Sequence, residues 1–368
     1  MKIMYVTTDL NMGGAEIQVM RICKYMAGNT HNEISFVSMM KPESVQMIKE
    51  LKALGVMTYS LNMARGKASL KAYRKFVSLV KHIRPEVIHT HMVHANFLSR
   101  AARPFIGKIK IINTIHGEEE YLGKRILLYK ASDRFADYTV ACGKVLYEQA
   151  LKYRISSPSK LKYICNGLDL SEYSFNQYER EQIRSGLKLA DDSFLWITVG
   201  RLSKVKNQTY LINEFYKVQR QYPNARLMIV GNGPLERELR NLVKKLDIEE
   251  AVIFAGKRDD VEKILSAADA FVLSSIHEGL PLSMQEAAAE GLPIVSTDVG
   301  GCNEVVLESE NGFLCESNKT NALADVMKKM LSLSKDQLRQ MGKMSRKIAL
   351  DKFDMSNVIK KWMTLYYD

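Results

Sequence analysis

The segment Ala270-Phe-Val-Leu-Ser-Ser-Ile-His277-Glu278-Gly-Leu-Pro281-Leu-Ser-Met-Gln-Glu286-Ala joins a strand, a loop and the start of a helix. The four apolar residues at 270–273 predict a short buried strand. Proline suits the first turn of a helix, where its missing N–H is no loss, and therefore predicts a helix over 281–290. A strand that leads through a loop into a helix is the repeating unit of an α/β fold.

The same alternation of short apolar runs and longer amphipathic runs continues in both directions along the 368-residue chain. It predicts parallel strands joined by right-handed helical crossovers, with helices on both faces of each sheet. The expected strands are 2–6, 34–39, 56–61, 87–89, 109–115 and 138–141, then 194–199, 226–230, 251–254, 270–273 and 293–296. The expected helices are 15–26, 69–83, 95–105 and 125–135, then 210–221, 234–246, 261–267, 281–290, 335–350 and 354–367.

The alternation of strands and helices starts again near residue 194. The predicted fold class is therefore α/β, with two Rossmann-like, doubly wound parallel-sheet domains that face a central cleft. We expect an N-terminal domain at 1–168, a C-terminal domain at 190–350 and a polar linker at 169–185. The last helix, about 354–368, has no strand after it and can pack back on the first domain. Ligands of open parallel sheets bind beyond the carboxyl ends of the strands, so the loops there are the candidate sites.

Composition excludes several classes of protein. Apolar residues make up 46% and charged residues 26% of the chain, as in ordinary globular proteins. No run approaches the roughly 18 apolar residues of a transmembrane helix, and the short apolar start does not resemble a signal peptide, so we expect a cytoplasmic protein. The five cysteines form no Cys-x-x-Cys pair, which argues against a zinc site and a disulfide framework.

The net charge of +12 comes from the first half of the chain. Residues 1–190 hold 29 Lys and Arg against 16 Asp and Glu, whereas residues 191–368 hold 24 against 25. The excess suggests an anionic partner, and the amphipathic stretch 69–83 is the candidate contact with an anionic membrane, although an ordinary basic surface would show the same pattern. Nucleic acid is not expected, because aromatic and basic residues are not interleaved and no helix-turn-helix pattern stands out.

Charged residues that can bind a diphosphate and hydroxyl groups follow two strands of the second domain. Arg201 and Lys206 come after its first strand, where a guanidinium and an ammonium could cradle a diphosphate. Glu278 and Glu286 flank the start of a helix, where carboxylates can accept hydrogen bonds from vicinal hydroxyls while the first N–H groups hold a phosphate. Alternatively, these four charged residues are ordinary solvated surface charges. The separate loop Gly231-Asn232-Gly233 is interpreted as a structural turn.

Glycines and histidines mark the strand ends of the first domain. Gly13-Gly14 follows the first strand and opens a helix, so backbone N–H groups could approach an anion or a sugar there; a tight turn fits equally well. His116 ends another strand and would point toward the expected cleft, unless it is a structural histidine. His89, His91 and His94 form a cluster, but only the first two share one strand face, so no metal site is expected.

In combination these motifs make the chain resemble glycosyltransferase family 4, of the bacterial surface-polysaccharide type, a large group of retaining nucleotide-sugar transferases with the GT-B fold. The most specific element is Glu278-Gly-Leu-Pro-Leu-x-x-x-Glu286-Ala, followed by Gly291-Leu-Pro-Ile-Val-x-Thr and Gly300-Gly301-x-x-Glu304. The loops Gly13-Gly14-Ala-Glu16, Gly200-Arg201-Leu-x-x-x-Lys206 and Asn166-Gly167-Leu-Asp169 agree with it, so the resemblance spans essentially the whole chain.

The resemblance implies catalytic roles for His116, Glu278, Arg201 and Lys206. The two cations would hold the donor diphosphate and stabilise the charge that develops as it leaves, in place of a metal. Glu286 would accept hydrogen bonds from ribose hydroxyls, Glu278 would contact hydroxyls of the transferred sugar, and His116 would lie beside that sugar. The implied donor-binding residues are Gly13, Gly14, Arg201, Lys206, Lys257, Arg258, Glu278, Gly279, Leu280, Leu282, Ser283 and Glu286. The implied acceptor-binding residues are His91, His94 and Asn96.

The implied function is the transfer of a hexose from a nucleoside-diphosphate donor, expected to be a UDP-sugar, with retention of configuration and without metal or cofactor. The implied acceptor is a lipid-linked or other saccharide of bacterial capsule, O-antigen or exopolysaccharide synthesis, used at the inner face of the cytoplasmic membrane. Three alternatives stay open: a GT-B-fold sugar-nucleotide epimerase, a GT-B-fold phosphorylase, and a non-catalytic module that binds anionic surfaces.

Overall fold

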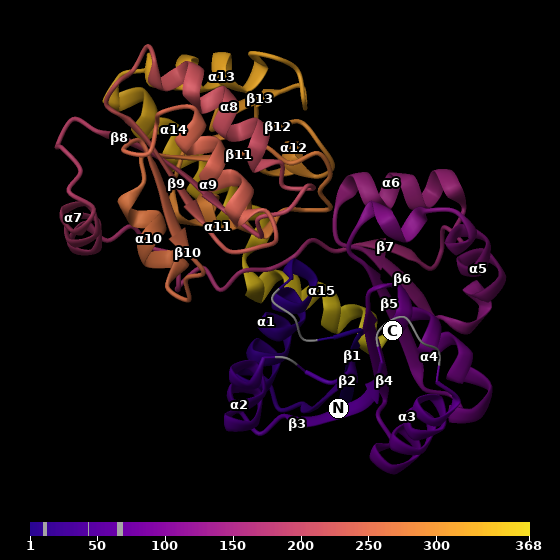
Figure 1. The fold of residues 1–368 in the computed structure, drawn as a ribbon. Coiled ribbons are helices and arrows are strands. Elements are labelled where there is room, and N and C mark those ends of the chain that lie inside the picture. The colour runs from indigo at the N-terminus through magenta and orange to yellow at the C-terminus, as the bar shows by residue number, and fades with distance from the viewer. Residues whose placement is uncertain (10–12, 43, 65–68) are drawn as a thin grey trace. The chain divides into compact units, whose positions relative to one another are not determined.

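The computed structural model describes all residues of the chain except 10–12, 43 and 65–68 (Figure 1). The chain divides into two compact units, one formed by Met1–Leu168 with Met355–Asp368 and the other by Asp169–Asp354. Each unit is built on a parallel sheet. Among the described residues, none of the helices is long and apolar enough to cross a membrane.

Among its described residues, the first unit has a sheet of seven parallel strands. They are β1 (Lys2–Thr7), β2 (Glu33–Met40), β3 (Met57–Met63), β4 (Val87–His91), β5 (Lys110–Ile115), β6 (Tyr138–Ala141) and β7 (Leu161–Tyr163). The helices are α1 (Gly14–Asn29), α2 (Val45–Ala53), α3 (Leu70–Ile83), α4 (Val93–Ile106), α5 (Lys124–Ser132), α6 (Lys144–Tyr153) and α15 (Met355–Tyr367), with short turns η1 (Glu118–Tyr121) and η2 (Asp133–Phe135). The strand order β3-β2-β1-β4-β5-β6-β7 reverses direction between β1 and β4, so right-handed crossovers place α1 and α2 on one face and α3 to α6 on the other.

Six parallel strands form the sheet of the second unit. They are β8 (Phe194–Val199), β9 (Ala225–Val230), β10 (Val252–Gly256), β11 (Ala270–Leu273), β12 (Ile294–Thr297) and β13 (Gly312–Cys315). The helices are α7 (Gln177–Gly186), α8 (Gln208–Gln219), α9 (Glu236–Lys245), α10 (Val261–Ala267), α11 (Leu282–Glu290), α12 (Cys302–Val305), α13 (Ala322–Leu331) and α14 (Lys335–Phe353). The order β10-β9-β8-β11-β12-β13 reverses between β8 and β11, which is where open α/β sheets bind ligands.

The elements that the sequence predicts are present, with ends that differ by a few residues, but several short elements have no predicted counterpart. Most of α7 falls in the stretch 169–185 that was expected to be a linker. This helix has no buried residue; it is held by Arg180 and Arg184, whose guanidinium groups lie 2.5 and 3.1 Å from the two carboxylate oxygens of Asp269. A helix attached by ion pairs leaves no apolar period in the sequence, which explains why it was missed.

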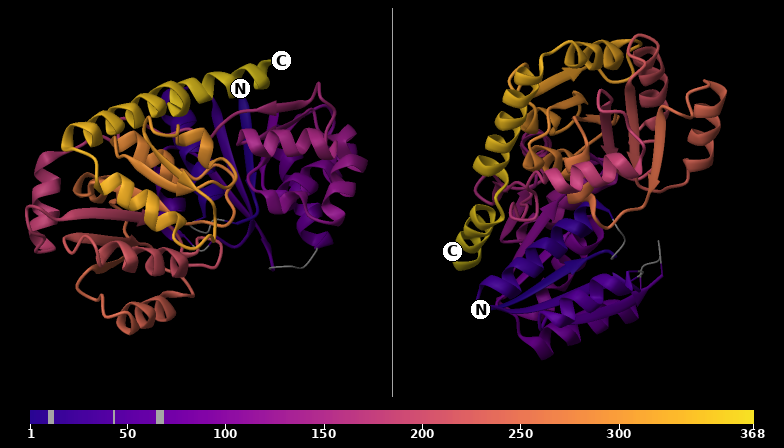
Figure 2. Two further views of the ribbon diagram at one scale, coloured as in Figure 1. Left: turned by 90° about the horizontal axis from the view of Figure 1, so that it is seen from above. Right: turned by 90° about the vertical axis from the view of Figure 1, so that its left-hand side faces the viewer.

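The C-terminal helix α15 belongs to the first unit and packs beside α1. Both views of Figure 2 place the two chain termini close together. Lys110 Nζ donates to the carbonyl oxygens of Leu365 and Tyr366 at 3.2 and 2.9 Å, a cation at the negative end of the helix. At the other end, a Cβ on Gly167 would lie 2.9 Å from Met355 Sδ, so the glycine permits the helix to approach closely.

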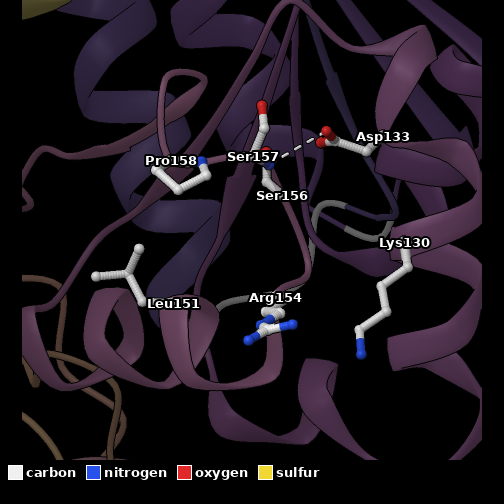
Figure 3. A pocket seen from close by; sticks show the side chains of 7 residues that line it. All are labelled: Lys130, Asp133, Leu151, Arg154, Ser156, Ser157 and Pro158. Carbon is white, nitrogen blue, oxygen red and sulfur yellow. Dashed lines mark hydrogen bonds between the residues drawn. The ribbon is translucent and has the colours of Figure 1, made fainter.

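A hollow of about 480 Å³ lies in the first unit where α5 and α6 end (Figure 3). Lys130 and Arg154 are among the residues that line it, and Asp133 accepts a hydrogen bond of 3.2 Å from the Ser157 N–H. Helices that follow parallel strands run back to the amino ends of those strands, so this hollow lies at the edge opposite the one that binds ligands in such sheets. None of its lining residues was predicted as a site residue.

Candidate active site

The loops after β8 and β11, at the reversal point of the second sheet, are joined by their backbones. The Ile276 N–H donates to the Val205 carbonyl oxygen at 2.9 Å. Ser274 Oγ donates to the Lys206 carbonyl oxygen at 2.9 Å. These bonds fix residues 200–207 against residues 274–281, although the two loops are far apart in sequence. They bring the predicted cations and the predicted carboxylates to one edge of the sheet.

Lys206 and Glu278 form an ion pair across these two loops. Lys206 Nζ lies 2.6 Å from Glu278 Oε1, and Ser275 Oγ donates to the same oxygen at 2.5 Å. The side chain of Glu278 is 10% exposed and that of Lys206 is 23% exposed, so the pair is only partly reached by water. No described residue donates to Glu278 Oε2. One carboxylate oxygen is therefore available for a hydroxyl donor.

Arg201 lies at the start of the same loop as Lys206, and its side chain is exposed. Its carbonyl oxygen accepts a hydrogen bond of 3.0 Å from Gln208 Nε2, which fixes the backbone. Its guanidinium has no hydrogen bond or ion pair with any residue that the structure describes. The Lys206 side chain passes close to Gly200, because a Cβ built there would lie 3.5 Å from Lys206 Cε. The loop after β8 therefore carries a guanidinium with no described partner and an ammonium with one carboxylate partner.

The N-terminus of α11 completes this edge. The N–H groups of Leu282 and Ser283 have no hydrogen-bond acceptor among the described residues, as is normal for the first turn of a helix. Such N–H groups and the helix dipole favour an anion. Glu286 lies one turn further along the face of Ser283 and is 8% exposed, so it does not point freely into solvent. The geometry can accommodate a phosphate at the helix start and hydroxyls near the carboxylate.

Glycines permit the close approach of neighbouring loops. Gly300 has φ +52°, and a Cβ there would collide with the Glu278 carbonyl oxygen. The next residue, Gly301, donates its N–H to the Gly279 carbonyl oxygen at 2.7 Å. The loop after β12 therefore supports the backbone that carries Glu278. Similarly, a Cβ on Gly231 would collide with the loop after β8, which agrees with the structural turn that its sequence favours.

Lys257 and Arg258, predicted near the nucleotide base, follow β10 and are exposed. Arg258 forms two hydrogen bonds of 2.8 and 2.7 Å with Asp260, which raise the pKa of the guanidinium and lower the pKa of the carboxyl. Lys257 Nζ lies 3.8 Å from Asp259. Both cations therefore have local acidic neighbours, in contrast to Arg201.

In the first unit, Gly13 is the N-cap of α1, which begins at Gly14. A Cβ on Gly13 would collide with the carboxyl group of Glu16, which folds back over the helix start. Burial, and then the carboxyl of Asp9, raise the pKa of Glu16 to about 8. An acid thus already lies at the positive end of α1. Residues 10–12, which precede the predicted glycine loop, lie outside the described residues.

His116 follows β5 and is half-buried. Its Nε2 lies 2.9 Å from Nδ1 of His91, and burial lowers the pKa of His116 to about 4. Its backbone N–H donates to Glu120 Oε1 at 2.9 Å, and Glu120 Oε2 accepts from the Tyr129 hydroxyl at 2.8 Å. Burial raises the pKa of Glu120 to about 8. Glu120 was not singled out in the sequence, because it lies in a run of three glutamates that resembles a solvated surface.

The predicted acceptor residues separate into two groups. His94 is exposed on α4, whereas His91 and Asn96 are fully buried. The Asn96 amide is used inside the core: it accepts from Thr90 Oγ1 at 2.7 Å and donates to the Tyr129 hydroxyl at 3.0 Å. Both side chains are buried in the unliganded protein, and the Asn96 amide takes part in a core hydrogen-bond network, so the predicted acceptor contacts of His91 and Asn96 stay a prediction. Within the described ranges, no group of three His, Cys, Asp or Glu is placed to hold a metal ion.

Solved structures with the GT-B fold resemble the fold of this chain over its full length. Anabaena HepE, solved in complex with UDP, covers 99% of both chains with a TM-score of 0.85 and 20% identity. The lipopolysaccharide outer core galactosyltransferase WaaB covers 100% of this chain and 99% of its own, with a TM-score of 0.75 and 18% identity. The two parallel-sheet units and these neighbours define the GT-B fold and confirm the predicted fold class.

Sequence comparisons then give the family. The model of Glycosyltransferase Family 4 matches residues 12–172, and that of Glycosyl transferases group 1 matches residues 179–348. N-acetyl-alpha-D-glucosaminyl L-malate synthase of Bacillus anthracis is 30% identical over 77% of this chain and 74% of its own. UDP-Gal:alpha-D-GlcNAc-diphosphoundecaprenol alpha-1,3-galactosyltransferase of Escherichia coli is 28% identical over 83% and 82%. The chain belongs to glycosyltransferase family 4 and is a hexosyltransferase, as the sequence motifs predict.

Proposed function

We propose that the protein transfers a hexose from a UDP-sugar to a lipid-linked or other saccharide acceptor in bacterial surface-polysaccharide synthesis, with retention of configuration. A nucleoside-diphosphate donor is supported by one cluster of groups on the loops after β8 and β11. It consists of Arg201, which has no described partner, the Lys206–Glu278 pair and the unused N–H groups of α11. This cluster offers a diphosphate several hydrogen-bond donors at one edge of a sheet. The binding of UDP and UDP-glucose by Anabaena HepE supports the choice of nucleotide.

In this proposal Arg201 and Lys206 stabilise the leaving diphosphate. Fixed cations are most effective where negative charge grows in the transition state. An ammonium group has three N–H donors, so Lys206 can keep Glu278 and still donate to phosphate oxygens. No metal ion is needed for this task if side chains supply the positive charge.

The two glutamates then hold the hydroxyl groups of the donor. Glu278 Oε2 accepts from a hydroxyl of the transferred sugar, and Glu286 accepts from the ribose. His116 contacts the transferred sugar. The acceptor attacks from the side of the leaving group, and a diphosphate oxygen assists its deprotonation, which accounts for retention.

The acceptor is proposed to be lipid-linked and reached at the membrane surface. The E. coli relative is named for a diphosphoundecaprenol acceptor. In the first unit, Leu70 and Phe105 are 64% and 57% exposed beside a groove of about 430 Å³ that also includes Arg74 and Lys81. Each basic residue near an anionic bilayer contributes about 1 kcal/mol of attraction, so this face suits a peripheral contact.

A panel of nucleotide sugars, tested for protection against heat denaturation, identifies the donor, because ligand binding raises apparent stability by mass action. Transfer from that donor to saccharide acceptors, with and without a chelator, then tests the reaction. A new glycosidic bond of unchanged anomeric configuration is expected with or without chelator. Release of UDP without a new glycosidic bond would instead indicate an epimerase, and a requirement for inorganic phosphate would indicate a phosphorylase.

A further inference from the structure

The ring of His116 contacts a buried row of aromatic rings that ends on the C-terminal helix. His91 Nδ1 lies 2.9 Å from His116 Nε2. The ring of His91 lies against that of His89, with centroids 4.1 Å apart, and His89 lies against Trp362 of α15 at 4.3 Å. His89 and His91 are both fully buried. The ring that contacts His116 is thus packed against a second ring and, through it, a helix.

His89 is fixed by hydrogen bonds at both ring nitrogens. Its Nδ1 lies 2.7 Å from the Tyr366 hydroxyl and its Nε2 lies 2.8 Å from Thr114 Oγ1. The Tyr366 hydroxyl lies 3.1 Å from that of Tyr5. Rotation of the His89 ring would break these hydrogen bonds in the core. The His91 ring is therefore packed against a ring of fixed orientation.

The hydrogen bonds of His91 indicate which ring nitrogen carries its proton. Burial lowers the pKa of both His91 and His116, so each imidazole is neutral near pH 7 and has one N–H. His91 Nε2 is buried and has no partner among the described residues. A buried N–H without an acceptor is rarer than a buried acceptor without a donor. The proton of His91 therefore belongs on Nδ1, from which it is donated to His116 Nε2.

We propose that His91 is a positioning residue that holds His116 as the tautomer protonated on Nδ1. No described residue accepts from that nitrogen, so His116 can present an N–H donor to a ligand. In this state His116 donates a hydrogen bond to an oxygen of the bound sugar and does not act as the base for the acceptor. The identity of the ligand rests on the proposed function, whereas the tautomer does not.

Nuclear magnetic resonance tests the tautomer directly. Long-range ¹H–¹⁵N spectra of the labelled protein distinguish protonated from unprotonated ring nitrogens, and the seven histidines are assigned by single substitutions. We expect His116 to be protonated on Nδ1 in the unmodified protein. His91→Phe keeps a stacked ring but removes the donor, and should give a mixture of tautomers. His91→Asn can replace the lost N–H and should restore the original state, and exposed His31→Asn is the matched control.

Kinetics provide a second measurement. We expect kcat/KM of His91→Phe to fall about fivefold to tenfold, the typical effect of one neutral hydrogen bond, and to recover in His91→Asn. Protonation of His116 on Nε2 in the unmodified protein would overturn the proposal, as would an unchanged His116 spectrum in His91→Phe. The unmodified spectrum decides even if that variant does not fold. Absence of UDP-sugar turnover by the unmodified protein would refute only the proposed function.

Discussion

Lys206 Nζ lies 2.6 Å from Glu278 Oε1, so the cation proposed to hold the donor diphosphate is paired with the acid proposed to hold the transferred sugar. The pair joins the loops after β8 and β11, at the point where the strand order of the second sheet reverses. Each side chain therefore positions the other. Loss of one partner should affect both the leaving group and the sugar.

Lys206→Ala should lower kcat/KM by about 100-fold or more, the scale found when one donor to a developing charge is removed. It should also lower stability, because Glu278 then loses its cation while remaining mostly buried. Steady-state kinetics and urea denaturation measure the two effects. Exposed Lys204→Ala, two residues away, is the control and should change neither. The double variant Lys206→Ala/Glu278→Gln should regain stability without activity; a double variant as unstable as Lys206→Ala would contradict the pairing.

Arg201→Ala should weaken UDP binding while leaving stability nearly unchanged. The side chain is exposed and has no partner among the described residues, so little is lost in the unliganded protein. A hydrogen bond to a charged group contributes about 1.5–3 kcal/mol, which corresponds to a loss of affinity of roughly 10- to 150-fold. Titration calorimetry with UDP and thermal denaturation test this separation. Unchanged UDP affinity would remove Arg201 from the site.

Gly300→Ala should destabilise the protein by about 1–3 kcal/mol and reduce activity. Its φ of +52° disfavours a side chain, and the new Cβ would collide with the Glu278 carbonyl oxygen. Gly28→Ala is a matched control, since nothing lies within 4 Å of the new Cβ and alanine is the better helix former. Urea denaturation of both variants should show loss for the first and none for the second. Equal stabilities would show that the loop is not held as described.

Glu16 should make stability fall as the pH rises from about 5 to 8. Burial raises its pKa in the folded protein to about 8, whereas the unfolded chain releases this proton near pH 4. Across that interval the folded state binds more protons, so stability decreases with pH by up to about 1.4 kcal/mol per unit. In Glu16→Gln this contribution should vanish and the pH dependence of urea denaturation should flatten. Exposed Glu33→Gln should leave the slope unchanged; an unaltered slope in Glu16→Gln would contradict the assignment.

Reversal of charge at Arg74 and Lys81 should reduce binding to anionic vesicles more than about tenfold, given the attraction of each basic residue to such a surface. Co-sedimentation with phosphatidylglycerol vesicles measures the loss, and added salt should weaken binding by the unmodified protein. Lys244→Glu/Lys245→Glu in the second unit is the control of equal charge change. A larger effect of the control pair would place the membrane contact elsewhere.

The sequence was sufficient to predict the two sheets, because short Val- and Ile-rich runs alternate with amphipathic ones in both halves. The spacing of Glu278 and Glu286 around a helix start was equally visible. The ion pair between Lys206 and Glu278 could not be predicted from the sequence, because its partners are 72 residues apart and are brought together only by the adjacent positions of β8 and β11 in the sheet. Local patterns reveal which loops follow strands, but the order of the strands decides which loops meet.

Buried polar networks are the other feature that the sequence does not reveal. The family resemblance implied acceptor contacts for Asn96 and His91, and no sequence pattern indicated that both side chains are buried. The structure uses them in the core, where Asn96 bonds to Thr90 and Tyr129, and where His91 contacts His116. Such networks join residues from several elements, and single-chain spacing carries no signal for them.

A crystal structure with bound UDP tests the central claim most directly. The account predicts that the diphosphate oxygens lie within hydrogen-bond distance of the Arg201 guanidinium, of Lys206 Nζ and of the Leu282 and Ser283 N–H groups. It also predicts that the ribose hydroxyls meet the Glu286 carboxylate. A diphosphate bound away from Arg201 and Lys206, with their side chains unchanged from the free protein, would contradict it.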